Sequence, residues 1–119
     1  MKDMKLGVIE TRFAEIIWEN APLSTNQLIQ LCAAELEWKR TTTYTVLKKL
    51  CDKGIFKTEN SMLTALISKQ ELEGMQSEQF VQETFQGSLP AFLTAFSTRR
   101  KLSSTDIDEL QKLIDQMRG

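Results

Sequence analysis

The stretch Lys39–Gly54, KRTTTYTVLKKLCDKG, has the pattern of an amphipathic helix. One face of this helix is apolar, because four side chains recur at helical spacing: Val46, Leu47, Leu50 and Cys51. Lys53 and Gly54 then provide the cation and the flexible residue that are common at helix ends. The stretch therefore predicts a helix over about 40–53, whose exposed side carries mainly threonine, tyrosine and lysine.

Two further helices are predicted before this stretch. The first runs to about Asn20 and has an apolar stripe at helical spacing: Ile9, Phe13, Ile16 and Ile17. The second begins where Ser24 and Gln27 have the spacing of a capping box, in which each side chain bonds a free N–H at the helix start. Its apolar stripe ends around 35–38. Three consecutive helices are thus expected before Gly54.

Two short strands are expected after Gly54, at 55–58 and 62–67, around a turn at 59–61. Three helices followed by a hairpin is the element order of a winged helix-turn-helix. The sequence therefore predicts such a domain over residues 1–69, mainly α-helical, with the small β-hairpin as its wing.

Residues 70–119 return to a helical pattern, with one helix starting after the Ser88 cap and another at Ser103 or Ser104. Their apolar stripes include six side chains: Phe92, Phe96, Ile107, Leu110, Ile114 and Met117. These side chains either complete one core with the rest of the chain or face a second copy. We favour the second copy, because three helices cannot easily bury such stripes among themselves. Residues 70–119 are therefore predicted to be a helical dimerisation domain.

The composition excludes several kinds of active site. The chain has 119 residues and no histidine, which rules out Ser-His-Asp triads, Cys-His dyads and histidine-ligated zinc. It has no phosphate-binding glycine loop, and Cys32 and Cys51 are expected to be small buried hydrophobes. No catalytic residue, metal or cofactor is predicted. Without a membrane-length apolar run or a secretory signal, we expect a cytoplasmic protein with no membrane partner.

Basic residues are concentrated around the third predicted helix. The formal net charge is −1, yet six of the fifteen Lys and Arg residues lie between Lys39 and Lys57, against the single acid Asp52. A recognition helix presents polar side chains to base edges and cations to phosphates. The pattern predicts a surface for double-stranded DNA: Lys39, Arg40, Thr41, Thr42, Tyr44, Thr45, Lys48 and Lys49. The same residues would also fit a solvated face with threonines that cap the helix start.

The sequence resembles the penicillinase-repressor family of bacterial winged-helix regulators, which includes methicillin-resistance and copper-responsive repressors. The resemblance lies in Glu15–Trp18 (EIIW), in the spacing of Ser24 and Leu28, and most strongly in Lys39–Leu50 followed by Lys53–Ile55. It extends over nearly the whole chain, since the helical second half has the length and order found in the family.

The resemblance implies a homodimeric repressor that binds a palindromic operator in double-stranded DNA. By position, Thr42, Tyr44 and Thr45 would face the operator, and Trp18 would lie in the core of the first helix. An inducing protein, such as a sensor protease, is a further implied partner.

Three departures from the family pattern limit this comparison. Copper-responsive members carry a cysteine-rich hook, whereas residues 115–119 read DQMRG, so copper sensing through such a hook is not expected. Penicillinase-type members are cleaved at an Asn-Phe bond; the matching bond here is Ala95–Phe96, and Phe96 also fits an interface residue four positions after Phe92. The wing carries Glu59 and no arginine, which leaves its contribution to DNA binding open.

A second interpretation is a winged-helix module that binds another protein and does not bind specific DNA. A fold alone does not decide function, and the near-zero net charge and acidic wing favour this interpretation. The two interpretations differ in what contacts the exposed side of the third helix.

Overall fold

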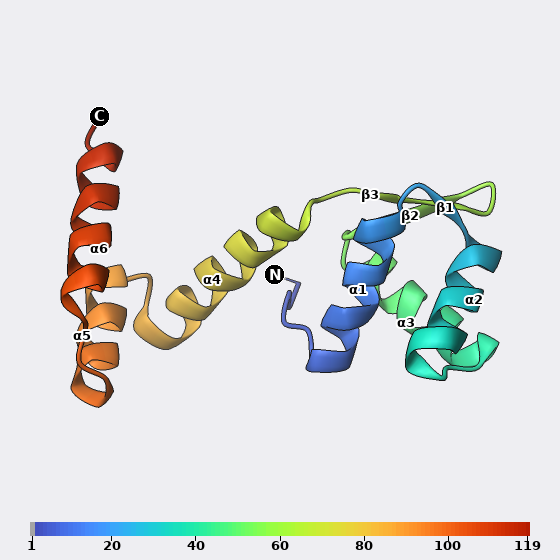
Figure 1. The fold of residues 1–119 in the computed structure, drawn as a ribbon, viewed down its shortest axis with the longest axis horizontal. Coiled ribbons are helices and arrows are strands. Elements are labelled where there is room, and N and C mark those ends of the chain that lie inside the picture. Colours follow the sequence, from blue (N-terminus) through green and yellow to red (C-terminus); the bar gives the residue numbers. More distant parts are fainter. Residues whose placement is uncertain (1) are drawn as a thin grey trace. The chain divides into compact units, whose positions relative to one another are not determined.

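The computed structural model describes residues 2–119, which form six helices and three short strands (Figure 1). The elements are α1 (Val8–Asn20), β1 (Leu23–Ser24), α2 (Thr25–Leu36), α3 (Arg40–Asp52), β2 (Phe56–Glu59), β3 (Met62–Ala65), α4 (Lys69–Phe85), α5 (Leu89–Arg99) and α6 (Ser104–Met117). The chain divides into two compact units, of which the first ends at Gln79 and the second spans Phe80–Gly119. The division lies within α4, whereas the sequence predicts one at the start of that helix.

Helices α2 and α3 begin and end where local sequence signals predict, and α1 ends at the predicted residue, Asn20. At the start of α2, Ser24 Oγ accepts a hydrogen bond from the Gln27 N–H (3.1 Å), and Gln27 Oε1 accepts one from the Ser24 N–H (2.8 Å). Beyond α3, Gly54 has a φ of +82°, the left-handed conformation that glycine adopts most easily. Helix α1 packs against α2, and α2 packs against α3 (Figure 1).

Side chains from these helices and from the sheet form the core of the first unit. Its buried apolar members are Met4, Phe13, Ala14, Ile16, Ile17, Leu23, Leu28, Cys32, Leu47, Leu50, Ile55, Phe56, Leu63 and Leu72. On α3, Val46 and Cys51 are half-buried, and Thr43 is a buried residue that the apolar pattern missed. Thr43 tolerates burial because its hydroxyl donates to the carbonyl oxygen of Lys39 (3.1 Å).

The apolar stripe of α1 differs from the predicted one at its first position. Ile9 is 54% exposed, so the first member of the predicted stripe does not belong to the core. The other three members of the stripe are buried: Phe13, Ile16 and Ile17. The turn that contains Ile9 is attached to α3 through Glu10. Trp18 is half-buried against the core, and its indole N–H donates to the carbonyl oxygen of Ile67 (3.0 Å).

The three strands form one antiparallel sheet in the order β1-β3-β2. Strands β2 and β3 are the predicted hairpin, and their loop residues Asn60 and Ser61 have φ values of 53° and 61°, as a type I′ turn requires. Strand β1 pairs Leu23 with Leu63 and was not predicted. A strand of two residues is too short to show an alternating pattern in the sequence. Leu23 and Ser24 are recognised as a strand only because they pair with β3.

The second unit contains the end of α4 together with α5 and α6. The Ser88 hydroxyl accepts from the Ala91 N–H (3.1 Å) and the Ser103 hydroxyl from the Asp106 N–H (3.0 Å), which caps both helices as predicted. Four rings contact one another with centroid separations from 5.6 to 6.2 Å: Phe80, Phe85, Phe92 and Phe96. Residues 80–119 are all described, and none of them is buried. The fold is therefore a winged helix with a complete core, followed by a helical unit without one.

Candidate nucleic-acid interface

Helix α3 places all eight predicted DNA-binding residues at the surface of the first unit. Each of them is exposed: Lys39, Arg40, Thr41, Thr42, Tyr44, Thr45, Lys48 and Lys49. With 3.6 residues per turn, the side of α3 opposite its buried residues is formed by Thr41, Thr45, Lys48 and Lys49. We call these four residues the outer face of α3.

Contacts of Arg40 hold the first turn of α3. Its guanidinium lies 6.0 Å from the centroid of the Tyr44 ring, and one of its nitrogens lies 3.4 Å from the side-chain oxygen of Asn26 in α2. On the outer face, the Thr45 hydroxyl donates to the carbonyl oxygen of Thr41 (2.9 Å). The hydroxyl proton of Thr45 is thus used within the helix, and the exposed hydroxyl oxygen can still accept a hydrogen bond from a base-edge donor.

The two lysines of the outer face have different partners. Lys48 has a side chain that is 80% exposed, and its Nζ lies 3.3 Å from the Asp52 carboxylate one turn away. Lys49 Nζ lies 2.6 Å from Oε2 of Glu10 in α1, and that glutamate side chain is only 22% exposed. The hydrogen bond from Lys49, with another from the Gly7 N–H, lowers the pKa of Glu10. Lys49 thus joins α3 to α1, whereas Lys48 extends into solvent.

A hollow of about 440 Å³ lies beside the C-terminal half of α3. It is lined by Lys2, Asp3, Thr45, Lys48, Lys49, Asp52 and Lys53. Four of these residues are absent from the predicted site: Lys2, Asp3, Asp52 and Lys53. No local pattern could have placed Lys2 and Asp3 beside α3, because the contact between Lys2 and Asp52 joins positions fifty residues apart.

A smaller hollow of about 310 Å³ separates α3 from the wing. It is lined by Thr25, Tyr44, Leu47, Lys48, Cys51 and Thr58. Burial raises the pKa of the Cys51 thiol, and burial raises the pKa of Cys32 to about 11, so both cysteines are protonated near neutral pH. On the wing itself, Lys57 Nζ pairs with the Glu59 carboxylate at 2.8 Å.

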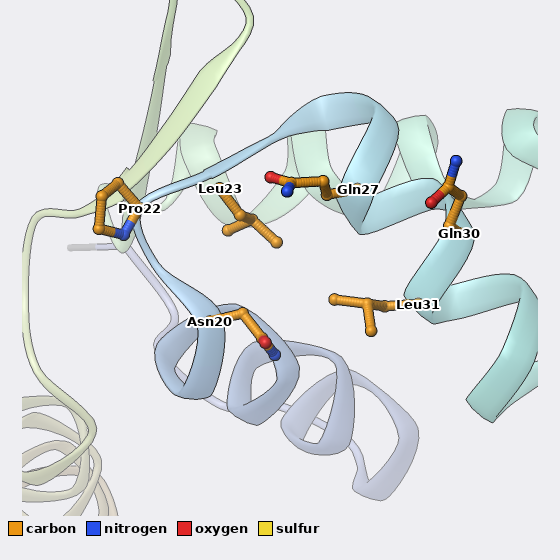
Figure 2. A pocket seen from close by; sticks show the side chains of 6 residues that line it. All are labelled: Asn20, Pro22, Leu23, Gln27, Gln30 and Leu31. Atoms are coloured by element: carbon orange, nitrogen blue, oxygen red, sulfur yellow. The ribbon is translucent and has the colours of Figure 1, made fainter.

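Figure 2 shows a third hollow, of about 340 Å³, between the end of α1 and the first turns of α2. The side chains of Asn20, Leu23 and Leu31 point toward the space between the two helices, and the remaining lining residues are Pro22, Gln27 and Gln30 (Figure 2). None of these six side chains carries a charge. The hollow therefore lacks the cations that a phosphate group would require.

The six side chains predicted at the dimer interface are half-buried or exposed in the single chain. Phe92 and Leu110 are half-buried, whereas four others are exposed by 41–75%: Phe96, Ile107, Ile114 and Met117. Leu89, 62% exposed, belongs to the same unit but is not among the six side chains predicted at the interface. The second unit therefore has a substantial apolar surface that its own helices leave exposed.

None of the helices in residues 2–119 has the length and apolar character needed to cross a membrane. The same range contains no cluster of three or more cysteine and carboxylate side chains arranged to hold a metal ion.

Comparison with known proteins places the chain among bacterial regulators. The family model described as penicillinase repressor matches residues 6–116. The methicillin resistance regulatory protein MecI of Staphylococcus aureus strain Mu50 is 23% identical over 119 residues, which cover 97% of each chain. The corresponding MecI of Mammaliicoccus sciuri is 22% identical with the same coverage. The penicillinase repressor of Bacillus licheniformis is 22% identical over 111 residues, covering 90% of this chain and 87% of that protein.

The element order and the three-stranded sheet define the first unit as a winged helix, with α3 in the position of the recognition helix. The family match extends over both units, and the chain belongs to the penicillinase repressor family. The role that follows is that of a transcriptional repressor and not of an enzyme. The resemblance found in the sequence is therefore confirmed.

Proposed function

We propose that the protein represses transcription as a homodimer that binds a palindromic operator in double-stranded DNA. The observation that carries this proposal is the outer face of α3, where exposed threonines and lysines lie opposite the side that contains the buried residues of the helix. Thr41 and Thr45 would contact base edges, and Lys48 would contact phosphate.

The apolar surface of the second unit supports the homodimer. Ile107, Ile114 and Met117 lie on α6 at intervals of seven and three residues and are all exposed in the single chain. Exposed stripes of this kind are stabilised when a second copy removes them from water. Two recognition helices held by such a dimer would meet half-sites about 34 Å apart, one turn of DNA.

The inducing signal is proposed to come from another protein. The bond between Ala95 and Phe96, which matches the cleaved bond of penicillinase-type repressors, lies inside α5. A protease that acts on extended backbone would therefore need α5 to unwind before cleavage. Limited proteolysis of free and DNA-bound protein, followed by mass spectrometry, would reveal whether cleavage occurs at this bond.

The test of operator binding is selection from randomised duplex DNA, followed by fluorescence anisotropy of the enriched sequences at several salt concentrations. We expect an enriched palindrome and an affinity that falls steeply with salt. Thr45→Val should reduce the preference for that palindrome, whereas Thr64→Val, on the exposed side of β3, should not.

Weak binding without any enriched sequence would contradict the proposal. A winged-helix module that binds a protein chain through the same face of α3 would then be the better interpretation.

A further inference from the structure

The residues before α1 are attached to the first unit at Met4. Its side chain is only 6% exposed and belongs to the core. Its N–H donates to Oε1 of Gln79 (2.9 Å), and its carbonyl oxygen accepts from Nε2 of Gln76 (2.9 Å). Both glutamines belong to α4, so both backbone polar groups of Met4 are satisfied by one helix. The segment Lys2–Lys5 is therefore a fixed part of the fold.

This attachment places Lys2 against the C-terminal end of α3. The Lys2 ammonium donates to the carbonyl oxygen of Asp52, and the Lys53 ammonium donates to the carbonyl oxygen of Asp3. The two contacts are reciprocal, since each lysine reaches the backbone beside the other. Within residues 2–119, the ion pairs that carboxylates form with lysine or arginine involve neither of these two ammonium groups.

The two ammonium groups open onto the hollow of about 440 Å³ that also contains Thr45 and Lys48. Four lysines and two aspartates line it, which leaves an excess of positive charge. The negative charge of Asp52 is opposed by Lys48, its partner in the helix. Lys2 and Lys53 therefore extend the positive surface of α3 beyond the eight residues predicted to bind DNA.

We propose that Lys2 and Lys53 form a second phosphate-contacting site for double-stranded DNA, next to the outer face of α3. This proposal rests on the proposed DNA-binding function and adds two residues to its interface. The fixed segment Lys2–Lys5 brings one cation to the site, and the end of α3 supplies the other. Because Lys2 is held before DNA arrives, little conformational entropy is lost when it meets a phosphate.

A purely structural role for these lysines has a different consequence. Cations near a helix C-terminus stabilise the helix through its dipole and its free carbonyl groups. In that case, removal of the charge would lower the stability of the first unit and leave the salt dependence of DNA binding unchanged. The salt dependence therefore distinguishes the two roles.

The experiment measures operator affinity against salt concentration for Lys2→Gln and Lys53→Gln in the full chain. The matched control is Lys5→Gln, which removes an exposed lysine of the same segment that does not line the hollow. Each lost phosphate contact reduces the slope of log K against log salt by about 0.9, or about 1.8 for a symmetric dimer. Between about 50 and 200 mM salt, the affinity of each variant should then fall roughly tenfold less than that of the wild type. The preferred sequence should stay the same.

Two outcomes overturn the inference. An unchanged slope for both variants, with or without lower thermal stability, would assign the lysines to helix capping alone. An equal loss of slope for Lys5→Gln would show that the effect is general charge and not a site. Absence of specific binding by the wild-type protein would be a different failure, because it would remove the proposed function itself.

Discussion

The two units of this protein have similar apolar patterns but different interiors. In the first unit, fourteen apolar side chains are buried, and Phe13, Ile17 and Leu28 are completely inaccessible. In the second unit, α5 and α6 have equally regular stripes, yet none of residues 80–119 is buried. A stripe of apolar residues therefore predicts a helix, but it does not indicate which surface covers that stripe.

The two units also differ in the sequence separation of the residues that their side-chain hydrogen bonds join. In the first unit, the Trp18 indole bonds the Ile67 carbonyl oxygen, forty-nine positions along the chain. In the second unit, hydroxyl bonds such as that of Thr94 to the Pro90 carbonyl oxygen stay within one turn. The first unit is thus stabilised by long-range contacts, whereas the helices of the second unit depend more on local signals and on whatever covers them.

The largest expected effect concerns the uncovered surface. The double substitution Leu110→Asp and Ile114→Asp places unpaired charges in the proposed dimer interface, at a cost on the order of 3–5 kcal/mol or more. Light scattering should then give the mass of one chain, 13.6 kDa, in place of twice that mass. Glu109→Gln, at a neighbouring exposed position, should leave the dimer intact. A dimer that survives the double substitution would place its interface elsewhere.

The next comparison is between a buried and an exposed phenylalanine. Phe13→Ala should destabilise the first unit by about 3–5 kcal/mol, because it leaves a cavity beside Trp38, whose ring centroid lies 5.3 Å away. Both tryptophans of the chain, Trp18 and Trp38, belong to the first unit, so urea unfolding followed by tryptophan fluorescence reports on that unit. Phe96→Ala should hardly change this transition. Equal shifts for both variants would mean that the two units unfold as one.

A smaller effect separates the two lysines of the outer face. Lys48→Met should reduce the salt slope of operator binding by about one per protomer and leave stability unchanged. Lys49→Met should mainly lower the thermal midpoint of the first unit, because it breaks the pair with Glu10. If Lys49→Met reduced the slope as much as Lys48→Met, the pair with Glu10 would have to open when DNA binds.

The smallest expected effect is the pH dependence of that same pair. The pKa of Glu10 is lowered in the folded chain, first by the hydrogen bond from Lys49. The ionised Glu10 carboxylate therefore stabilises the folded chain fully above the pKa of the unfolded chain, near 4.5. This stabilisation is lost as the pH falls through the lower pKa of Glu10 in the folded chain. Glu10→Gln should remove this part of the acid dependence, by less than about 1 kcal/mol. The urea unfolding midpoints of the wild type and of Glu10→Gln, measured between about pH 3 and 6, would test this expectation. If the two midpoints changed in parallel with pH, the pair of Glu10 and Lys49 would not contribute to the acid dependence.

Much of the candidate site could be predicted from local sequence. The exposed positions of α3 follow from the spacing of Leu47 and Leu50, and the start of α2 follows from Ser24 and Gln27. Both signals operate within one or two turns of helix, where sequence spacing and spatial neighbourhood coincide. Thr43 was missed because a hydroxyl that bonds its own helix can be buried at little cost.

The sequence by itself determined the helices, their caps, the hairpin and the basic exposed side of α3, because each depends on residues only a few positions apart. The tertiary structure alone decided that Leu23 pairs with Leu63, that Lys49 meets Glu10, and that Lys2 lies against the end of α3. These contacts join positions thirty-nine to fifty residues apart, and no periodicity connects such positions. They exist because the packing of a shared core brings distant segments together.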